Sequence, residues 1–148
     1  MILHLVDDEK VINRAIDFFE RALPGQNVFV CFCQKDKNGT YSPRHVGTNR
    51  GVLFYDIRQD NVDLPFEKIN QIVVHALYDY KVSFLERYVP TNIPVCWLLW
   101  GHDMYGQILY GMGYPLFPHC TSSQTHKEWL FNRVKKLLGY QSAQAKWL

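Results

Sequence analysis

A Rossmann-like α/β domain, with a mainly parallel sheet between two helical layers, is the fold class that the sequence predicts. Short apolar runs alternate with segments of helical periodicity along the 148 residues, which is the order of βαβ units. Several of these runs are apolar at every position, as strands covered on both faces are. The length suits one domain of ordinary size, so we expect residues 1–148 to form a single soluble domain.

The first half of the chain is expected to hold three strands and one long helix. The strands are Ile2–Val6, Val28–Cys33 and Val52–Tyr55. The helix lies between the first two strands, because apolar residues recur there at helical spacing. These residues are Val11, Ile12, Ala15, Ile16, Phe19, Ala22 and Leu23. Asp7 or Asp8 is expected to cap the start of the helix, and Pro24-Gly25 to end it.

The second half repeats the pattern after a short connection around residues 60–70. A strand at Ile72–His75 precedes a helix at about Tyr80–Tyr88, with Val82, Phe84 and Leu85 facing inward. Pro94–Trp100 is then a buried strand, and Gly101 ends it. An aromatic and glycine-rich segment, 105–118, and a helix at about 122–138 complete the chain.

Charge and cysteine content narrow the class of protein. The net charge of +2 is too mild for a nucleic-acid-binding face. No apolar run approaches the roughly 20 residues that span a bilayer, and the chain opens without a signal peptide. Cys31, Cys33 and Cys96 lie in or next to apolar runs and are expected to be buried thiols in a reducing, cytoplasmic compartment. The sequence contains no CxxC pair, the pattern that would indicate a zinc site.

Polar residues at the carboxyl ends of the predicted strands are the candidates for chemistry, because parallel sheets bind ligands there. Gly101 would allow a sharp turn that exposes the carboxylate of Asp103, which could deprotonate or orient a sugar hydroxyl. Trp100 and Tyr105 offer flat faces for a carbohydrate. His75 could act as a base. The simpler alternatives are a helix-capping Asp103 and a structural His75.

Other sites fit the sequence less well. The turn after the first strand has no glycine, whereas dinucleotide domains need Gly-x-Gly-x-x-Gly there. His119, Cys120 and His126 match no standard metal-ligand spacing, so no metal is expected. The basic residues near Trp129 and along the last helix could contact anionic lipid, or form a solvated face.

The alternative class is a non-catalytic α/β binding module, of which a receiver-like signalling module is the specific candidate. Such a domain holds magnesium with acidic residues after its first strand, where Asp7-Asp8-Glu9 lies, and Asp56 would be its phosphoacceptor. The later strands end in His75-Ala76 and Trp100-Gly101, where receivers place Ser or Thr and Lys-Pro. We therefore expect no phosphorylation of Asp56.

Two motifs carry a family resemblance. One strand ends in His75-Ala76-Leu77-Tyr78-Asp79, and the next in Trp100-Gly101-His102-Asp103-Met104-Tyr105. With the opening residues 3–12 and, more weakly, Tyr114-Pro115-Leu116, they resemble the amino-terminal half of the bacterial 4-acetamido-4,6-dideoxygalactose (Fuc4NAc) transferases, which extend a lipid-linked oligosaccharide. That family has His-x-x-aromatic-Asn/Asp and Trp-Gly-x-Asp-Leu-Tyr at these places, so Met104 replaces a Leu.

The resemblance implies one half of a GT-B glycosyltransferase, whose carboxy-terminal half holds the nucleotide-sugar. The chain would be the acceptor-side domain, inactive by itself. A reading frame that continues past Leu148 into a second α/β unit would favour this interpretation, and one that ends there would count against it. Asp103 would be the first candidate for the acceptor base and His75 the second. The acceptor cleft would be lined by Tyr78, Asp79, Trp100, Gly101, Tyr105 and Asp8.

The resemblance also implies the partners. These are a nucleotide-sugar donor, bound by the missing domain, and a polyprenyl-diphosphate-linked glycan acceptor. GT-B enzymes use no catalytic metal, and no cofactor is expected. Weak peripheral contact with the inner face of the cell membrane, without nucleic acid, would bring the domain to its acceptor.

Overall fold

The structure is a computed structural model that describes residues 1–47, 50–56, 63–101 and 103–104. The chain divides into two compact units. The first holds Met1–His75 and Phe84–Leu98, and the second holds Ala76–Ser83 and the residues from Leu99 onward. Tyr105, the segment 105–118 and the predicted helix at 122–138 lie outside the described residues.

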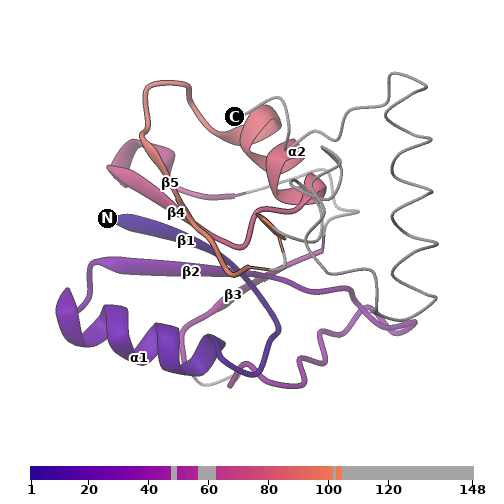
Figure 1. Ribbon diagram of the computed structural model, residues 1–148. Coiled ribbons are helices and arrows are strands. Elements are labelled where there is room, and N and C mark those ends of the chain that lie inside the picture. Colours follow the sequence, from indigo (N-terminus) through magenta and orange to yellow (C-terminus); the bar gives the residue numbers. More distant parts are fainter. Residues whose placement is uncertain (48–49, 57–62, 102, 105–148) are drawn as a thin grey trace, which may run out of the picture. The chain divides into compact units, whose positions relative to one another are not determined.

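Five parallel strands form the sheet of the first unit, in the order β3-β2-β1-β4-β5 (Figure 1). They are β1 Ile2–Asp7, β2 Asn27–Phe32, β3 Leu53–Tyr55, β4 Gln71–His75 and β5 Val95–Leu98. This is the order of a Rossmann sheet, in which the chain builds outward from β1 on one side and then crosses to the other. The predicted α/β class is therefore confirmed.

The same order bears on the receiver-like alternative. Receiver domains and flavodoxins have the strand order 2-1-3-4-5, in which the second strand occupies one edge. Here β2 lies inside the sheet, between β1 and β3. The receiver interpretation therefore does not fit the topology of this sheet.

Helical residues pack on both faces of the sheet. Helix α1 (Ile12–Ala22) covers one face, where Ile12 and Ile16 form a buried cluster with Cys31 and others. Phe32 follows Cys31 in β2 and so points to the opposite face. There its ring lies 5.4 Å from that of Phe84, a residue of helix α2 (Asp79–Tyr88). With α1 on one face of the sheet and residues of α2 on the other, the predicted three-layer arrangement is present.

The start of α1 differs from the prediction. The helix begins after Val11, and no side chain caps it. Asp7 and Asp8, expected to cap it, lie further upstream, and the carboxylate of Asp8 accepts hydrogen bonds from a distant loop instead. The connection between β3 and β4 contains only a short 3-10 turn, η1 Phe66–Lys68.

Strand β5 is less buried than predicted. It is the last strand in the sheet order, so it is paired along one edge only, and Val95 and Cys96 are exposed. Cys33 is half-buried because it lies just past the end of β2. Of the three thiols expected to be buried, only Cys31 is.

Candidate functional site

Asp8 lies at the point of the first unit where Rossmann sheets bind ligands. The strand order reverses between β1 and β4, and the crevice outside their carboxyl ends is the usual ligand site. The Oδ1 atom of Asp8 accepts the backbone N–H groups of His45 and Val46 at 2.8 and 2.9 Å, and its Oδ2 atom accepts that of Arg44 at 2.5 Å. Asp8, predicted to bind substrate, thus holds a loop of its own chain.

The negative charge of the Asp8 carboxylate strengthens these hydrogen bonds, which anchor the loop at residues 44–46. Burial by itself raises the pKa of Asp8, but the N–H groups of Arg44, Val46 and His45, with the charge of His45, lower that pKa overall. The carboxylate is therefore ionised at neutral pH. Ionised acceptors form the stronger class of hydrogen bond.

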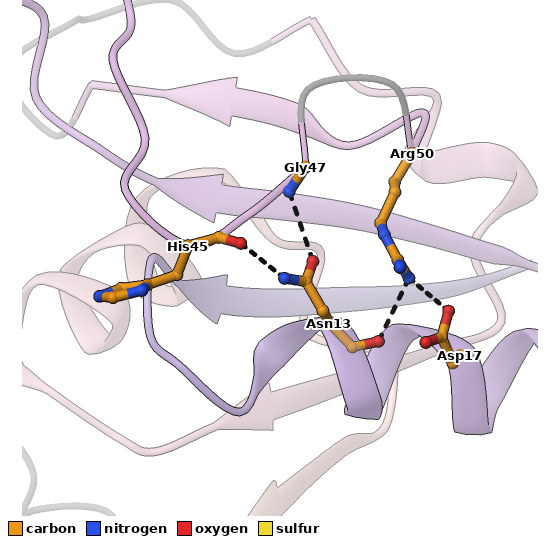
Figure 2. A network of polar contacts seen from close by, with 5 residues as sticks. All are labelled: Asn13, Asp17, His45, Gly47 and Arg50. Atoms are coloured by element: carbon orange, nitrogen blue, oxygen red, sulfur yellow. Dashed lines mark hydrogen bonds and ion pairs between the residues drawn. The ribbon is translucent and has the colours of Figure 1, made fainter.

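Figure 2 shows a second anchor of the same loop, on α1. The side-chain amide of Asn13 donates to the carbonyl oxygen of His45 at 2.5 Å, and its Oδ1 atom accepts the N–H of Gly47 at 3.3 Å. Arg50 forms an ion pair with Asp17 and donates to the carbonyl oxygen of Asn13. The loop is thus attached both to the end of β1 and to α1.

His75, the second candidate base, is buried beneath α1. Its side chain is only 3% exposed, and its ring lies 5.6 Å from that of Phe19 in an edge-on arrangement. The Nε2 atom of His75 lies 3.1 Å from Nδ1 of His4, on the neighbouring strand β1. The Nε2 atom of His4 in turn lies 3.1 Å from Oδ1 of Asn27.

The proton positions in this chain follow from Asn27. Its Nδ2 atom donates to main-chain carbonyl oxygens near the end of α1, so its Oδ1 atom is the acceptor and Nε2 of His4 must donate. Burial lowers the pKa of His4 more than the bond to Asn27 and the charge of Glu20 raise it. A neutral His4 accepts at Nδ1, and His75 therefore donates from Nε2.

In the second unit, Asp103 joins the two motifs that carry the family resemblance. The carboxylate is fully buried. Its Oδ2 atom accepts the backbone N–H of Leu77 at 3.0 Å, and its Oδ1 atom accepts those of Trp100 and Met104, each also at 3.0 Å. The predicted glycine turn is present, since Gly101 has a φ of 85°.

A group of aromatic and charged residues follows Leu77 at the start of α2, next to the hydrogen bond between Leu77 and Asp103. The rings of Tyr78 and Tyr80 are stacked, with centroids 5.5 Å apart and planes 19° apart. Asp79, between them in sequence, is exposed. Lys81 is fully buried, with its Nζ atom 3.0 Å from the carbonyl oxygen of Ala76 and 5.5 Å from the centre of the Tyr78 ring.

The predicted site residues therefore separate into two groups. The second unit contains the acceptor-cleft candidates Tyr78, Asp79, Trp100 and Gly101, with Asp103 bonded to the turn before them. His75 and Asp8 belong to the first unit and bond within it. Tyr105 is outside the described residues.

Sequence reasoning missed Lys81 and His4. Lys81 lies three and four positions before the buried Phe84 and Leu85, so helical periodicity alone would have placed it on the inner face of α2. His4 alternates with apolar residues in a buried strand, and a polar side chain in such a place needs a hydrogen-bonding partner.

Comparison of the chain with family models, curated proteins and solved structures found no match. Among the described residues, no group of three or more His, Cys, Asp or Glu side chains is arranged to hold a metal ion. In the same part of the chain, no helix has both the length and the apolar content to cross a membrane.

Proposed function

We propose that this chain is the acceptor-side domain of a glycosyltransferase. The complete enzyme would move a deoxyamino-sugar similar to Fuc4NAc from a nucleotide-sugar to a lipid-linked glycan, in the synthesis of a cell-surface polysaccharide. The hydrogen bond between Asp103 and Leu77 carries this proposal. Within the second unit, it joins residues of the two motifs on which the family resemblance rests.

The turn after β1 supports the division of labour in this proposal. It reads Asp7-Asp8-Glu9-Lys10 and has no glycine, whereas a Rossmann domain that grips a diphosphate brings backbone N–H groups close to it through glycines. Asp8 adds a negative charge there, with its lowered pKa. The nucleotide-sugar would therefore bind to a second domain, and this one would present the acceptor.

Tyr78, Tyr80 and Asp79 are suited to contact a sugar. Aromatic rings offer broad apolar surface with a polar tip, which complements the C–H face and the hydroxyl groups of a pyranose. The two tyrosines are half-buried and stacked, and Asp79 is exposed beside them. Asp79 is also in the first turn of α2, where the helix dipole favours a carboxylate.

The same geometry reassigns the base. Asp103 was the first candidate, but its carboxylate is fully buried and three backbone N–H groups bind its oxygens. His75 is buried against His4. A general base must reach the proton that it removes, so we assign this role to the exposed Asp79, with Asp103 as a positioning residue.

The acceptor would be a glycan on a polyprenyl diphosphate. An enzyme acting on such a lipid meets its substrate at the cytoplasmic face of the membrane, where a mildly basic protein is weakly attracted to anionic lipid. We therefore include peripheral membrane contact in the proposal. Nucleic acid and a catalytic metal have no part in it.

Sugar transfer by the full-length protein tests this function. Radiolabelled nucleoside-diphosphate-Fuc4NAc would be incubated with bacterial membranes that contain lipid-linked oligosaccharides. The proposal predicts label in the lipid fraction that mild acid releases, as expected of a glycosyl diphosphate. Incorporation no greater than in a protein-free incubation would contradict it. Labelled UDP-glucose serves as the donor control and is expected to give much less transfer.

A further inference from the structure

The buried ammonium group of Lys81 has no explanation in the proposed chemistry. Its side chain is the largest of those that are fully buried in the described residues. Moving an ammonium group out of water is strongly unfavourable unless polar partners compensate. The carbonyl oxygen of Ala76, at 3.0 Å, is one such partner, and the face of the Tyr78 ring is a second.

Lys81 and Asp103 bind the same peptide group. The carbonyl oxygen of Ala76 accepts from Lys81, and the N–H of Leu77 donates to Asp103. These two atoms belong to the one peptide bond between Ala76 and Leu77, and they point in opposite directions because that bond is trans. A buried cation and a buried carboxylate therefore hold this peptide from its two edges.

This peptide needs such support. Ala76 has a φ of 56° and is the one non-glycine residue with positive φ in the described part of the chain. Cβ then lies too close to the following carbonyl oxygen, so residues other than glycine rarely adopt this conformation. Strained backbone of this kind persists only where its surroundings enforce it.

We propose that Lys81 and Asp103 form a clamp that holds Ala76 in the left-handed conformation and so fixes Tyr78 and Asp79 for the acceptor sugar. The clamp itself follows from the contacts of Ala76 and Leu77, whereas its purpose rests on the proposed function. Lys81 and Asp103 are positioning residues, since each acts through the turn and not on the substrate.

A double-mutant experiment tests the clamp without any ligand. Native-state amide exchange would be measured on the full chain for Lys81→Met, Ala76→Gly and the double variant. The energetic cost of the left-handed backbone conformation at Ala76 predicts roughly tenfold faster exchange of the Leu77 amide in Lys81→Met. Glycine adopts positive φ without strain, so Ala76→Gly should return exchange in the double variant toward the wild-type rate. Lys37→Met, on an exposed turn, is the matched control and should leave this amide unchanged.

Two results of the amide-exchange measurement would overturn the clamp. One is an unchanged Leu77 amide in Lys81→Met. The other is a double variant that exchanges as fast as Lys81→Met, because Lys81 would then serve only core packing. If Lys81→Met does not fold, the clamp predicts that the double variant folds, and failure of both would reject it.

Sugar transfer separates the clamp from the proposed function. With labelled nucleoside-diphosphate-Fuc4NAc as donor, Lys81→Met should raise the amount of acceptor membranes needed for half-maximal rate, with the pH profile unchanged, and Ala76→Gly should reverse this rise. If Ala76→Gly reverses the effect of Lys81→Met on exchange of the Leu77 amide but the wild type transfers no sugar, the proposed function alone is rejected. Transfer by the wild type without coupling between positions 76 and 81 would reject the clamp alone.

Discussion

The carboxylate of Asp103 accepts the backbone N–H of Leu77 at 3.0 Å, across 26 positions of sequence. Both groups are buried, and the same carboxylate also accepts the N–H groups of Trp100 and Met104. A carboxylate used in this way determines the shape of two turns. It follows that a change at Asp103 acts first on folding.

Asp103→Asn should therefore destabilise the protein. An asparagine amide cannot accept at both of its side-chain atoms, so a donor would face a donor at a buried position, which costs about 1–3 kcal/mol. Urea unfolding measures this free energy. Glu86→Gln, which changes an exposed carboxylate on α2, is the control, and equal unfolding free energies for the two variants would refute the structural role of Asp103.

Asp8→Asn should release the loop at residues 44–46. One atom of the new asparagine side chain would be a donor that faces the exposed N–H of Arg44. Because water can replace this hydrogen bond, we expect a loss of only about 0.5–1.5 kcal/mol, with faster amide exchange at Arg44, His45 and Val46. Asp17→Asn removes only the partly exposed ion pair with Arg50 and should change stability by less than about 1 kcal/mol. Unchanged exchange in the loop of Asp8→Asn would contradict the anchor.

Acid should weaken the protein through His4. Because the pKa of His4 is lowered in the folded state, the unfolded chain binds its proton more readily, and folding is penalised as His4 becomes protonated. This stabilisation is fully present above about pH 6.5 and is lost as the pH falls below that value. Unfolding free energies measured from pH 7.5 to 5 should show this decline, and His4→Phe should show a shallower one. An equally steep decline in the variant would rule out His4 as its source.

The fold could be predicted largely from the sequence because its signals are local. Apolar runs such as 28–33 indicate strands buried on both faces, and the spacing of Ile12 and Ile16 indicates the inner side of α1. The periodicity of apolar residues does not indicate whether a strand lies at the centre or at the edge of the sheet. The run 94–100 was therefore expected to be buried, although β5 is an edge strand.

The site was predictable only in part. Tyr78, Asp79 and Trp100 follow strand ends, and the rule for parallel sheets finds them. The partners of Asp8 are 36 to 38 positions away, and nothing in the sequence near Asp8 indicates them. The same is true of the bond from Asp103 to Leu77, on which the proposed change from a base to a positioning residue rests.

The most direct test of the account is sugar transfer by full-length Asp79→Asn. If Asp79 takes the proton of the acceptor hydroxyl, as proposed, its replacement by Asn should lower the rate of Fuc4NAc transfer by about 10²–10⁴-fold. The urea unfolding free energy should fall by no more than about 1 kcal/mol, because Asp79 is exposed and loses only its interaction with the helix dipole. Glu86→Gln should transfer at the wild-type rate. Wild-type transfer by Asp79→Asn would contradict the acceptor site proposed here.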